Sequence, residues 1–290
     1  MSRGRRARGA PQVYWRSRGQ GEATLLLVNG YSASSLAWPR EWVAGLAESF
    51  RVIMPDNRGS GFSRQVETPF SIADMAADLV DVLDDAEVDR AVVMGHSMGG
   101  MIAQQLALDA PRRVAGLALV GTRPPVPRFT PPSPRVLTAL MRPVLPGESL
   151  RAYLRRLWAL AAAPGFAAAE PEAIEELVDQ TAERPTPRAM LTAQLRAMSG
   201  WGHAERLARL GLPTAIVHGS VDRFVPPANG HALAELIAGS RLVEIEGIGH
   251  LVPQEAPELL AAELRGLAAE ADGRVAVGAT GNSSVHKEER

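Results

Sequence analysis

The chain has 290 residues and a formal net charge of -1 at pH 7, so it can bury a large core and lacks the positive charge of a dedicated nucleic-acid binder. It contains no cysteine, which excludes disulfides, thiol nucleophiles and cysteine-ligated metal sites. Its six histidines show no metal-ligand spacing, and no apolar stretch approaches the roughly 18 residues that a membrane span needs.

Residues 1–11 form a basic segment that includes the pair Arg5-Arg6. No apolar stretch follows this pair, so the segment does not match a secretory signal, and we expect a cytoplasmic protein. A short basic segment of this kind cannot bury a core, which predicts a disordered tail. An arm that binds nucleic acid is the alternative interpretation.

Short apolar runs alternate with helix-forming stretches over residues 12–122 and again over residues 209–270. This alternation is typical of βαβ units and predicts an α/β fold, a mostly parallel twisted sheet with helices on both faces. Ser71, with Asp74 three residues later, is expected to cap a helix over residues 72–83. The predicted strands span residues 12–16, 24–28, 51–54, 91–94, 114–120, 213–217 and 241–245. The other predicted helices span about residues 36–48, 101–108, 228–237 and 256–269, and Pro39 is expected to interrupt or begin the first of them.

The alternation stops at Gly121. Residues 123–208 begin with prolines and continue with alanine, leucine, arginine and glutamate, which favour helices. Because the strand–helix pattern resumes afterwards, we predict that they form a helical cap inserted into the α/β core. Residues 271–290 are polar and contain glycine and serine, and we expect a second disordered tail there.

The most informative stretch is Gly95-His96-Ser97-Met98-Gly99, which joins a strand-type run to a helix-forming segment. A serine at the apex of so sharp a turn needs a strained backbone with φ above zero, and glycines two residues to either side avoid a collision. The turn exposes the hydroxyl above a helix N-terminus, which can stabilise an oxyanion. Gly-x-Ser-x-Gly in this context predicts a nucleophilic serine. The alternative is a glycine-rich turn that binds phosphate or no ligand.

A serine hydroxyl needs a base to activate it, and the base needs an acid to orient it. Asp222 and His250 each stand on a loop that follows a predicted strand, so both belong at the same edge of the sheet as Ser97. The order Ser, Asp, His along the chain is that of α/β-hydrolase triads.

On these residues the chain resembles the α/β-hydrolase family over about residues 12–270. The turn around Ser97 matches the nucleophile elbow of that family residue for residue, and residues 56–63 resemble its Asp-x-Arg-Gly-x-Gly-x-Ser loop. The subgroup that is most similar comprises bacterial esterases, lactonases and cofactor-free haloperoxidase-like enzymes, with polyketide-tailoring methylesterases close to them. The resemblance implies a cap after the sixth strand and a serine hydrolase that needs neither cofactor nor metal.

The resemblance also implies an oxyanion hole made by the backbone N–H groups of Tyr31 and Met98. The family usually has His-Gly before this loop, whereas Asn-Gly stands here, a change that leaves the backbone donors in place. Four residues are candidates for the substrate pocket, although the two tryptophans are equally interpretable as core residues: Asn29, Gly30, Trp38 and Trp201.

Three other sets of polar residues are predicted to support the fold and not to take part in catalysis. His96 is expected to be packed or bonded to a loop, since one turn cannot aim both His96 and Ser97 at the same substrate atom. Asp56 and Arg58 are predicted to form a buried ion pair within their loop. His218 ends a predicted strand and is expected to be a core histidine with its hydrogen bonds satisfied.

The predicted function is hydrolysis of a small-molecule carboxylic ester or lactone, with no nucleic-acid or membrane partner. Ser97 attacks the carbonyl, His250 takes its proton and later activates water, and Asp222 orients His250. C–C bond hydrolysis, or haloperoxidase or perhydrolase chemistry, on the same triad is one alternative. A ligand-binding protein or a biosynthetic cyclase with little hydrolytic activity is another.

Overall fold

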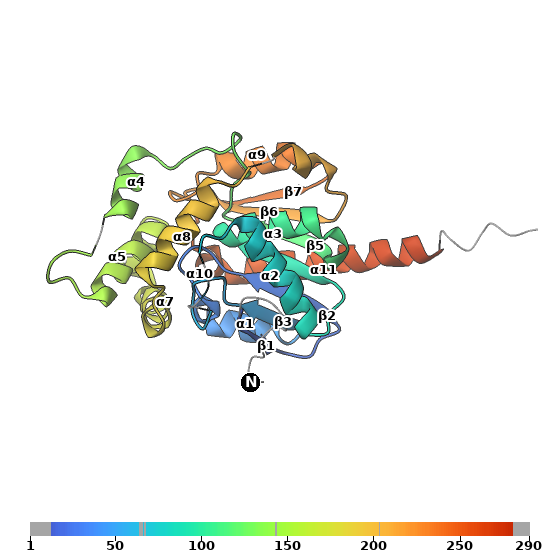
Figure 1. The fold of residues 1–290 in the computed structure, drawn as a ribbon, viewed down its shortest axis with the longest axis horizontal. Coiled ribbons are helices and arrows are strands. Elements are labelled where there is room, and N and C mark those ends of the chain that lie inside the picture. Colours follow the sequence, from blue (N-terminus) through green and yellow to red (C-terminus); the bar gives the residue numbers. More distant parts are fainter. Residues whose placement is uncertain (1–12, 64–65, 67, 143, 203, 281–290) are drawn as a thin grey trace, which may run out of the picture.

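Figure 1 shows the fold as a computed structural model, which describes residues 13–63, 66, 68–142, 144–202 and 204–280. The predicted basic tail at residues 1–11 lies outside these residues. In the described part of the chain, seven strands form one sheet in the spatial order β1-β3-β2-β4-β5-β6-β7. Only β1 is antiparallel to its neighbour there, which confirms the mostly parallel sheet. The strands are β1 (Trp15–Arg18), β2 (Ala23–Val28), β3 (Phe50–Pro55), β4 (Ala91–His96), β5 (Val114–Val120), β6 (Thr214–Gly219) and β7 (Arg241–Ile245).

Helices cover both faces of the sheet because successive strand residues point to opposite faces. Leu26 and Val28 of β2 pack in a cluster with apolar residues of α2, α3 and α9, whereas Leu25 and Leu27 pack with residues of α1 and α11. The helices of this core are α1 (Arg40–Leu46), α2 (Ile72–Asp85), α3 (Met98–Asp109), α9 (Ala228–Leu236), α10 (Val252–Glu255) and α11 (Pro257–Thr280).

The interruption expected at Pro39 is confirmed, because the helical stretch at residues 36–48 is divided in two. A 3₁₀ helix spans Ser35–Ala37, and α1 begins only at Arg40. Trp38 is extended between them, with φ -76° and ψ 135°, because a residue that precedes proline avoids the helical conformation. The predicted capping box at the start of α2 is confirmed, since Ser71 and Asp74 each bind the backbone N–H of the other.

The C-terminal end corrects an expectation. The disordered tail was expected to begin at residue 271, but α11 continues to Thr280, so residues 271–280 are helical. Alanine recurs through this stretch and has the highest helix propensity, while Leu267 and Ala271 are buried against the core. Residues 281–290 lie outside the described residues.

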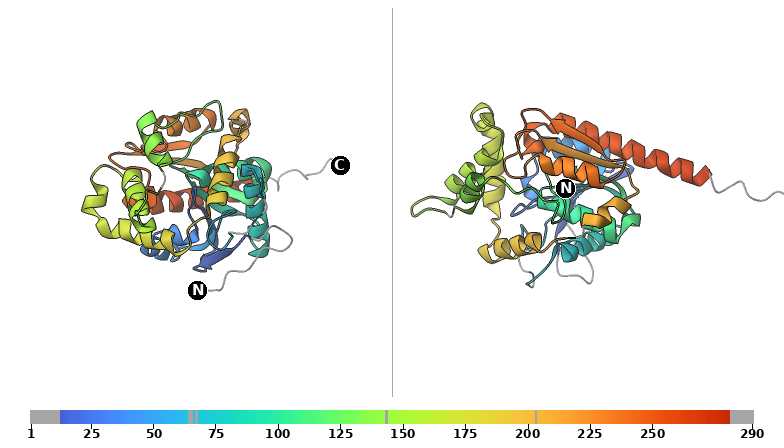
Figure 2. Two further views of the ribbon diagram at one scale, coloured as in Figure 1. Left: turned by 60° about the vertical axis from the view of Figure 1, so that its left-hand side comes forward. Right: turned by 90° about the horizontal axis from the view of Figure 1, so that it is seen from above.

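Residues 123–208, which the sequence predicts to be a cap and which are here named the cap segment, connect β5 to β6 and are helical for much of their length. Within the cap segment α5 and α7 pack together through Leu154, Trp158, Ile174 and Leu177. Figure 1 and both views of Figure 2 show α4, α5 and α7 together on one side of the sheet. The helices are α4 (Pro134–Met141), α5 (Leu150–Ala161), α6 (Phe166–Ala169), α7 (Pro171–Glu183) and α8 (Arg188–Ser199), followed by a 3₁₀ helix at Ala204–Arg209.

Candidate active site

Ser97 occupies the turn between β4 and α3, with φ 56° and ψ -122°. This is the positive φ that the motif predicts. A Cβ atom on Gly95 would lie 2.3 Å from the carbonyl oxygen of Gly99, and one on Gly99 would lie 2.1 Å from that of Val28. Side chains at these two positions would therefore push the turn apart. The backbone is held on both sides, since the Ser97 N–H donates to Val120 and its carbonyl accepts from the Thr122 hydroxyl.

Asp222 and His250 follow β6 and β7, and both are buried. The distance between His250 Nδ1 and Asp222 Oδ2 is 2.7 Å. The other carboxylate oxygen, Oδ1, accepts the N–H groups of Phe224 at 2.8 Å and Val225 at 2.9 Å. The carboxylate is thus fixed by its own loop through Oδ1, while Oδ2 lies next to the imidazole ring of His250 and 3.6 Å from Nε2 of His218.

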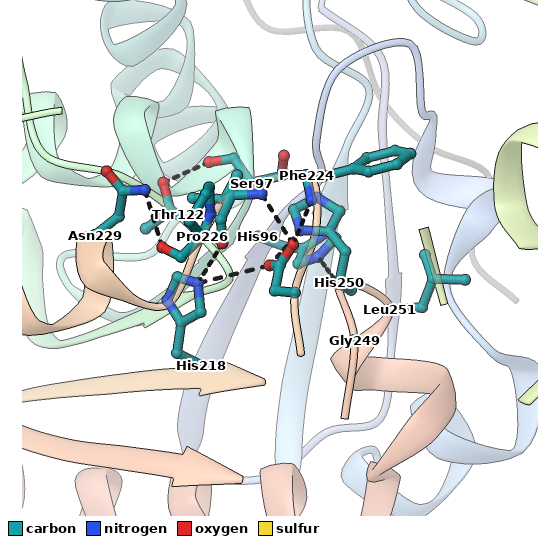
Figure 3. Close-up of polar contacts among 12 residues, drawn as sticks. His96, Ser97, Thr122, His218, Phe224, Pro226, Asn229, Gly249, His250 and Leu251 are labelled. Atoms are coloured by element: carbon teal, nitrogen blue, oxygen red, sulfur yellow. Dashed lines mark hydrogen bonds and ion pairs between the residues drawn. The ribbon is translucent and has the colours of Figure 1, made fainter. Parts of the chain in front are cut away.

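The elbow and the Asp–His pair meet in one cluster. The rings of His96 and His250 lie 4.8 Å apart, and His96 Nε2 donates to the His250 carbonyl oxygen at 2.8 Å. A Cβ atom on Gly121, at the end of β5, would lie 3.3 Å from His250 Nδ1. Figure 3 shows Ser97 in the same group as His96 and His250. The structure therefore brings the predicted serine, acid and base together at the carboxyl edge of the sheet.

The loop after β2 approaches the same serine. A Cβ atom on Gly30 would lie 3.6 Å from Ser97 Oγ. Asn29 shapes this loop, because its Oδ1 accepts the Gly30 N–H at 2.8 Å and its Nδ2 donates to the Ser34 carbonyl at 2.9 Å. Within the described residues, the N–H groups of Tyr31 and Met98 have no hydrogen-bond partner.

A family model described as "alpha/beta hydrolase fold" matches residues 23–257. The chain belongs to this family. The α/β-hydrolase is 30% identical over 265 residues to the "Putative carbamate hydrolase RutD" of Azorhizobium caulinodans, with 91% of this chain and 97% of that protein covered. It is also 30% identical over 267 residues to the "Rhodomycin D methylesterase DnrP" of Streptomyces peucetius, with 84% of this chain and 90% of that protein covered. The solved structure of a thermophilic esterase from Thermogutta terrifontis matches with a TM-score of 0.72 and 27% identity, with 90% of this chain and 94% of that chain covered. The chain is thus an enzyme of the α/β-hydrolase class.

The candidate pocket residues of this α/β-hydrolase occupy different places. Gly30 lies beside Ser97 Oγ, whereas the amide of Asn29 is directed into its own loop. Trp38 is 2% exposed and packs edge-on against His96. Trp201 is also buried, and its indole N–H donates to Gln105 at 3.0 Å. The structure gives both tryptophans the positions of core residues.

Sequence reasoning missed two residues near the base. The ring of Phe224 lies 5.3 Å from that of His250, and Glu255 binds the backbone on either side of His250. Phe224 stands two residues after Asp222, and this closeness in sequence was the only indication that it lies near the site. Glu255 carries no signal of its own, since a glutamate five residues after a histidine is a common pattern.

Two structural interpretations need correction. Arg58 forms its ion pair with Asp78 of α2, and the carboxylate of Asp56 instead accepts the N–H groups of Ser35 and Phe62. The predicted pair was therefore wrong, because a partner distant in sequence lies closer in space. His218 Nε2 contacts the Val225 carbonyl at 2.8 Å, but its Nδ1 has no hydrogen-bond partner within the described residues.

The described part of the chain holds no cluster of three or more histidine or acidic side chains that could bind a metal ion. None of its helices is both long and apolar enough to cross a membrane.

His96 is confirmed as a residue bonded to a loop, and this position predicts a pH effect on stability. Burial, with a smaller contribution from His250, lowers the pKa of His96 from 6.5 to about 3. Between these values the unfolded chain binds a proton that the folded protein does not, so the free energy of unfolding falls as the pH falls. Between pH 7 and pH 5 this contribution amounts to about 2 kcal/mol.

The measurement is chemical denaturation of the wild type and His96→Gln at pH 7, 6 and 5. Glutamine can still donate to the His250 carbonyl but does not titrate. The wild type is expected to lose about 2 kcal/mol more stability than the variant over this range. Two parallel pH profiles would contradict the assignment of a neutral, buried His96.

Proposed function

We propose that this α/β-hydrolase cleaves a carboxylic ester or a lactone through an acyl-enzyme formed on Ser97. The observation that carries the proposal is the 2.7 Å contact between His250 Nδ1 and Asp222 Oδ2, beside a serine held at a φ of 56°. The similarity to a methylesterase and to a putative carbamate hydrolase supports it, since methyl esters and carbamates are both attacked at a carbonyl carbon.

Asp222 keeps His250 in one tautomer. Because Oδ1 is bound by two backbone N–H groups, Oδ2 faces the ring as an acceptor, and Nδ1 carries the proton. The lone pair on Nε2 then takes the hydroxyl proton of Ser97 while Oγ attacks the carbonyl carbon. The carboxylate stabilises the imidazolium that results.

The N–H groups of Tyr31 and Met98 are the proposed donors to the oxyanion. Met98 opens α3, so its N–H stands at the positive end of the helix dipole. The tetrahedral intermediate collapses when His250 protonates the leaving alcohol. His250 then removes a proton from water, and the resulting attack on the acyl-enzyme releases the acid and restores Ser97.

We infer that the chain is divided into a hydrolase core and an inserted cap. Residues 12–122 and 209–270 form the hydrolase core, and the cap segment covers the carboxyl edge of the sheet, where α5 meets the loop of His250. Gly30 and Phe224, which lie beside Ser97 and His250, are proposed to line the substrate pocket.

The test of the function is turnover on a panel of small substrates. We expect hydrolysis of p-nitrophenyl acetate, butyrate or octanoate, or of a simple lactone, and the order of rates will give the size of the acyl pocket. Cleavage of a β-diketone without turnover of any ester would favour C–C bond hydrolysis. Tight ligand binding by a folded protein with no turnover would favour a receptor or a cyclase.

A further inference from the structure

The loop that carries His250 is joined to the end of the cap helix α5. The His250 N–H donates to the carbonyl oxygen of Ala161 at 2.9 Å. The neighbouring Gly249 packs so tightly there that a Cβ atom on it would lie 2.4 Å from the backbone nitrogen of Ala163. We name residues 161–163 the α5 end. The candidate base therefore receives part of its backbone support from the cap segment.

Glu255 adds further hydrogen bonds between the His250 loop and the α5 end. Its Oε2 accepts the N–H of Gly249 at 3.0 Å and the N–H of Ala163 at 2.9 Å. Its Oε1 accepts the N–H of Leu251 at 3.0 Å. One carboxylate thus binds the residues immediately before and after His250 and ties them to the α5 end. Hydrogen bonds to a charged acceptor are about twice as strong as those between neutral groups.

The loop that carries Asp222, the candidate acid, also contacts the α5 end. Arg223 follows Asp222 and donates from Nη2 to the carbonyl oxygen of Ala162 at 2.7 Å. The last carbonyl groups of a helix carry partial negative charge and lack partners inside the helix, so a guanidinium is favourable there. Both loops that bear triad candidates are consequently attached to the α5 end.

The backbone of His250 is held at both ends. Its N–H binds the α5 end, and its carbonyl accepts the Nε2–H of His96 from the elbow. The position of the His250 backbone therefore depends on the α5 end as well as on the elbow.

We propose that Glu255 is a positioning residue for His250, and that it acts by fixing the His250 loop to the α5 end. This inference rests on the proposed function, in which His250 takes the proton of Ser97. Glutamine at position 255 offers one oxygen and turns an NH₂ group toward an N–H of the loop, so the loop must shift. A misplacement of about 1 Å at a reacting group can cost about 10²-fold in rate.

The experiment compares Glu255→Gln with the wild type, using p-nitrophenyl butyrate turnover and the rate of labelling by a fluorophosphonate. We expect kcat and the labelling rate to fall together by about 10- to 100-fold, with KM changed by less than about threefold. A merely structural role would lower the melting temperature and leave kcat per folded molecule unchanged. The matched control is Glu258→Gln, a change at an exposed glutamate in the first turn of α11, which should behave as the wild type.

A second variant, Gly249→Ala, moves the α5 end without removing the carboxylate. It should lower kcat in the same way, and the double variant should lose less activity than the product of the two single losses. A folded Glu255→Gln variant with wild-type kcat and labelling would overturn the role of Glu255 and leave the proposed function intact. A wild type that neither hydrolyses esters nor is labelled would contradict the proposed function, and this inference with it.

Discussion

Replacing Ser97 with alanine is expected to lower kcat for p-nitrophenyl butyrate by a factor on the order of 10⁴ or more. Without Oγ no acyl-enzyme can form, and His250 has no hydroxyl to activate. The fold should be retained, since the backbone groups of residue 97 keep their bonds to Val120 and Thr122. The measurement is steady-state turnover at matched concentrations of folded protein, checked by circular dichroism.

The control for this change is Ser199→Ala. Ser199 is exposed at the end of α8, and its hydroxyl donates to the Arg196 carbonyl. Its removal should leave kcat within about twofold of the wild type, because surface changes away from the site have small effects. Near-normal turnover in Ser97→Ala would mean that the chemistry does not pass through this serine.

Replacing Asp222 with asparagine is expected to lower kcat by about 10⁴. The Oδ1 position accepts the N–H groups of Phe224 and Val225, so the amide oxygen remains there and the NH₂ group turns toward His250. Nδ1 must then act as an acceptor, and the ring proton moves to Nε2. In that tautomer His250 cannot take the proton of Ser97.

Asp272→Asn provides the matched control, because Asp272 is exposed on α11 and the change in charge is the same. This variant should retain wild-type kcat. If Asp222→Asn loses stability but keeps its kcat, the carboxylate serves the loop and does not orient the base.

Much of the α/β core could be predicted from the sequence because its strands and turns depend on residues that are close together in the chain. The strand β5 has the predicted bounds, since it is a continuous apolar run between two turns. The positive φ of Ser97 followed from the two glycines around it, which admit the sharp turn. The split of the helix at Pro39 likewise follows from the chemistry of one residue.

The remaining features depend on residues that meet only in space. Arg58 pairs with Asp78, twenty positions away, and the nearer Asp56 binds backbone groups. Whether Trp201 lines a pocket or packs in the core depends on its contact with Gln105 of α3. The partners of the Glu255 carboxylate in the His250 loop and at the α5 end are backbone N–H groups, which every non-proline residue possesses. No pattern of side chains in the sequence therefore predicts this contact.

In the proposed mechanism His250 and Asp222 activate Ser97. The most direct measurement is reaction of the wild type with a fluorophosphonate, followed by mass spectrometry of the digested protein. We expect one adduct per chain, on the peptide that contains Ser97, and no adduct in Ser97→Ala. A well-folded wild type that gains no adduct, or an adduct that persists at the same level in Ser97→Ala, would show that Ser97 is not the activated nucleophile.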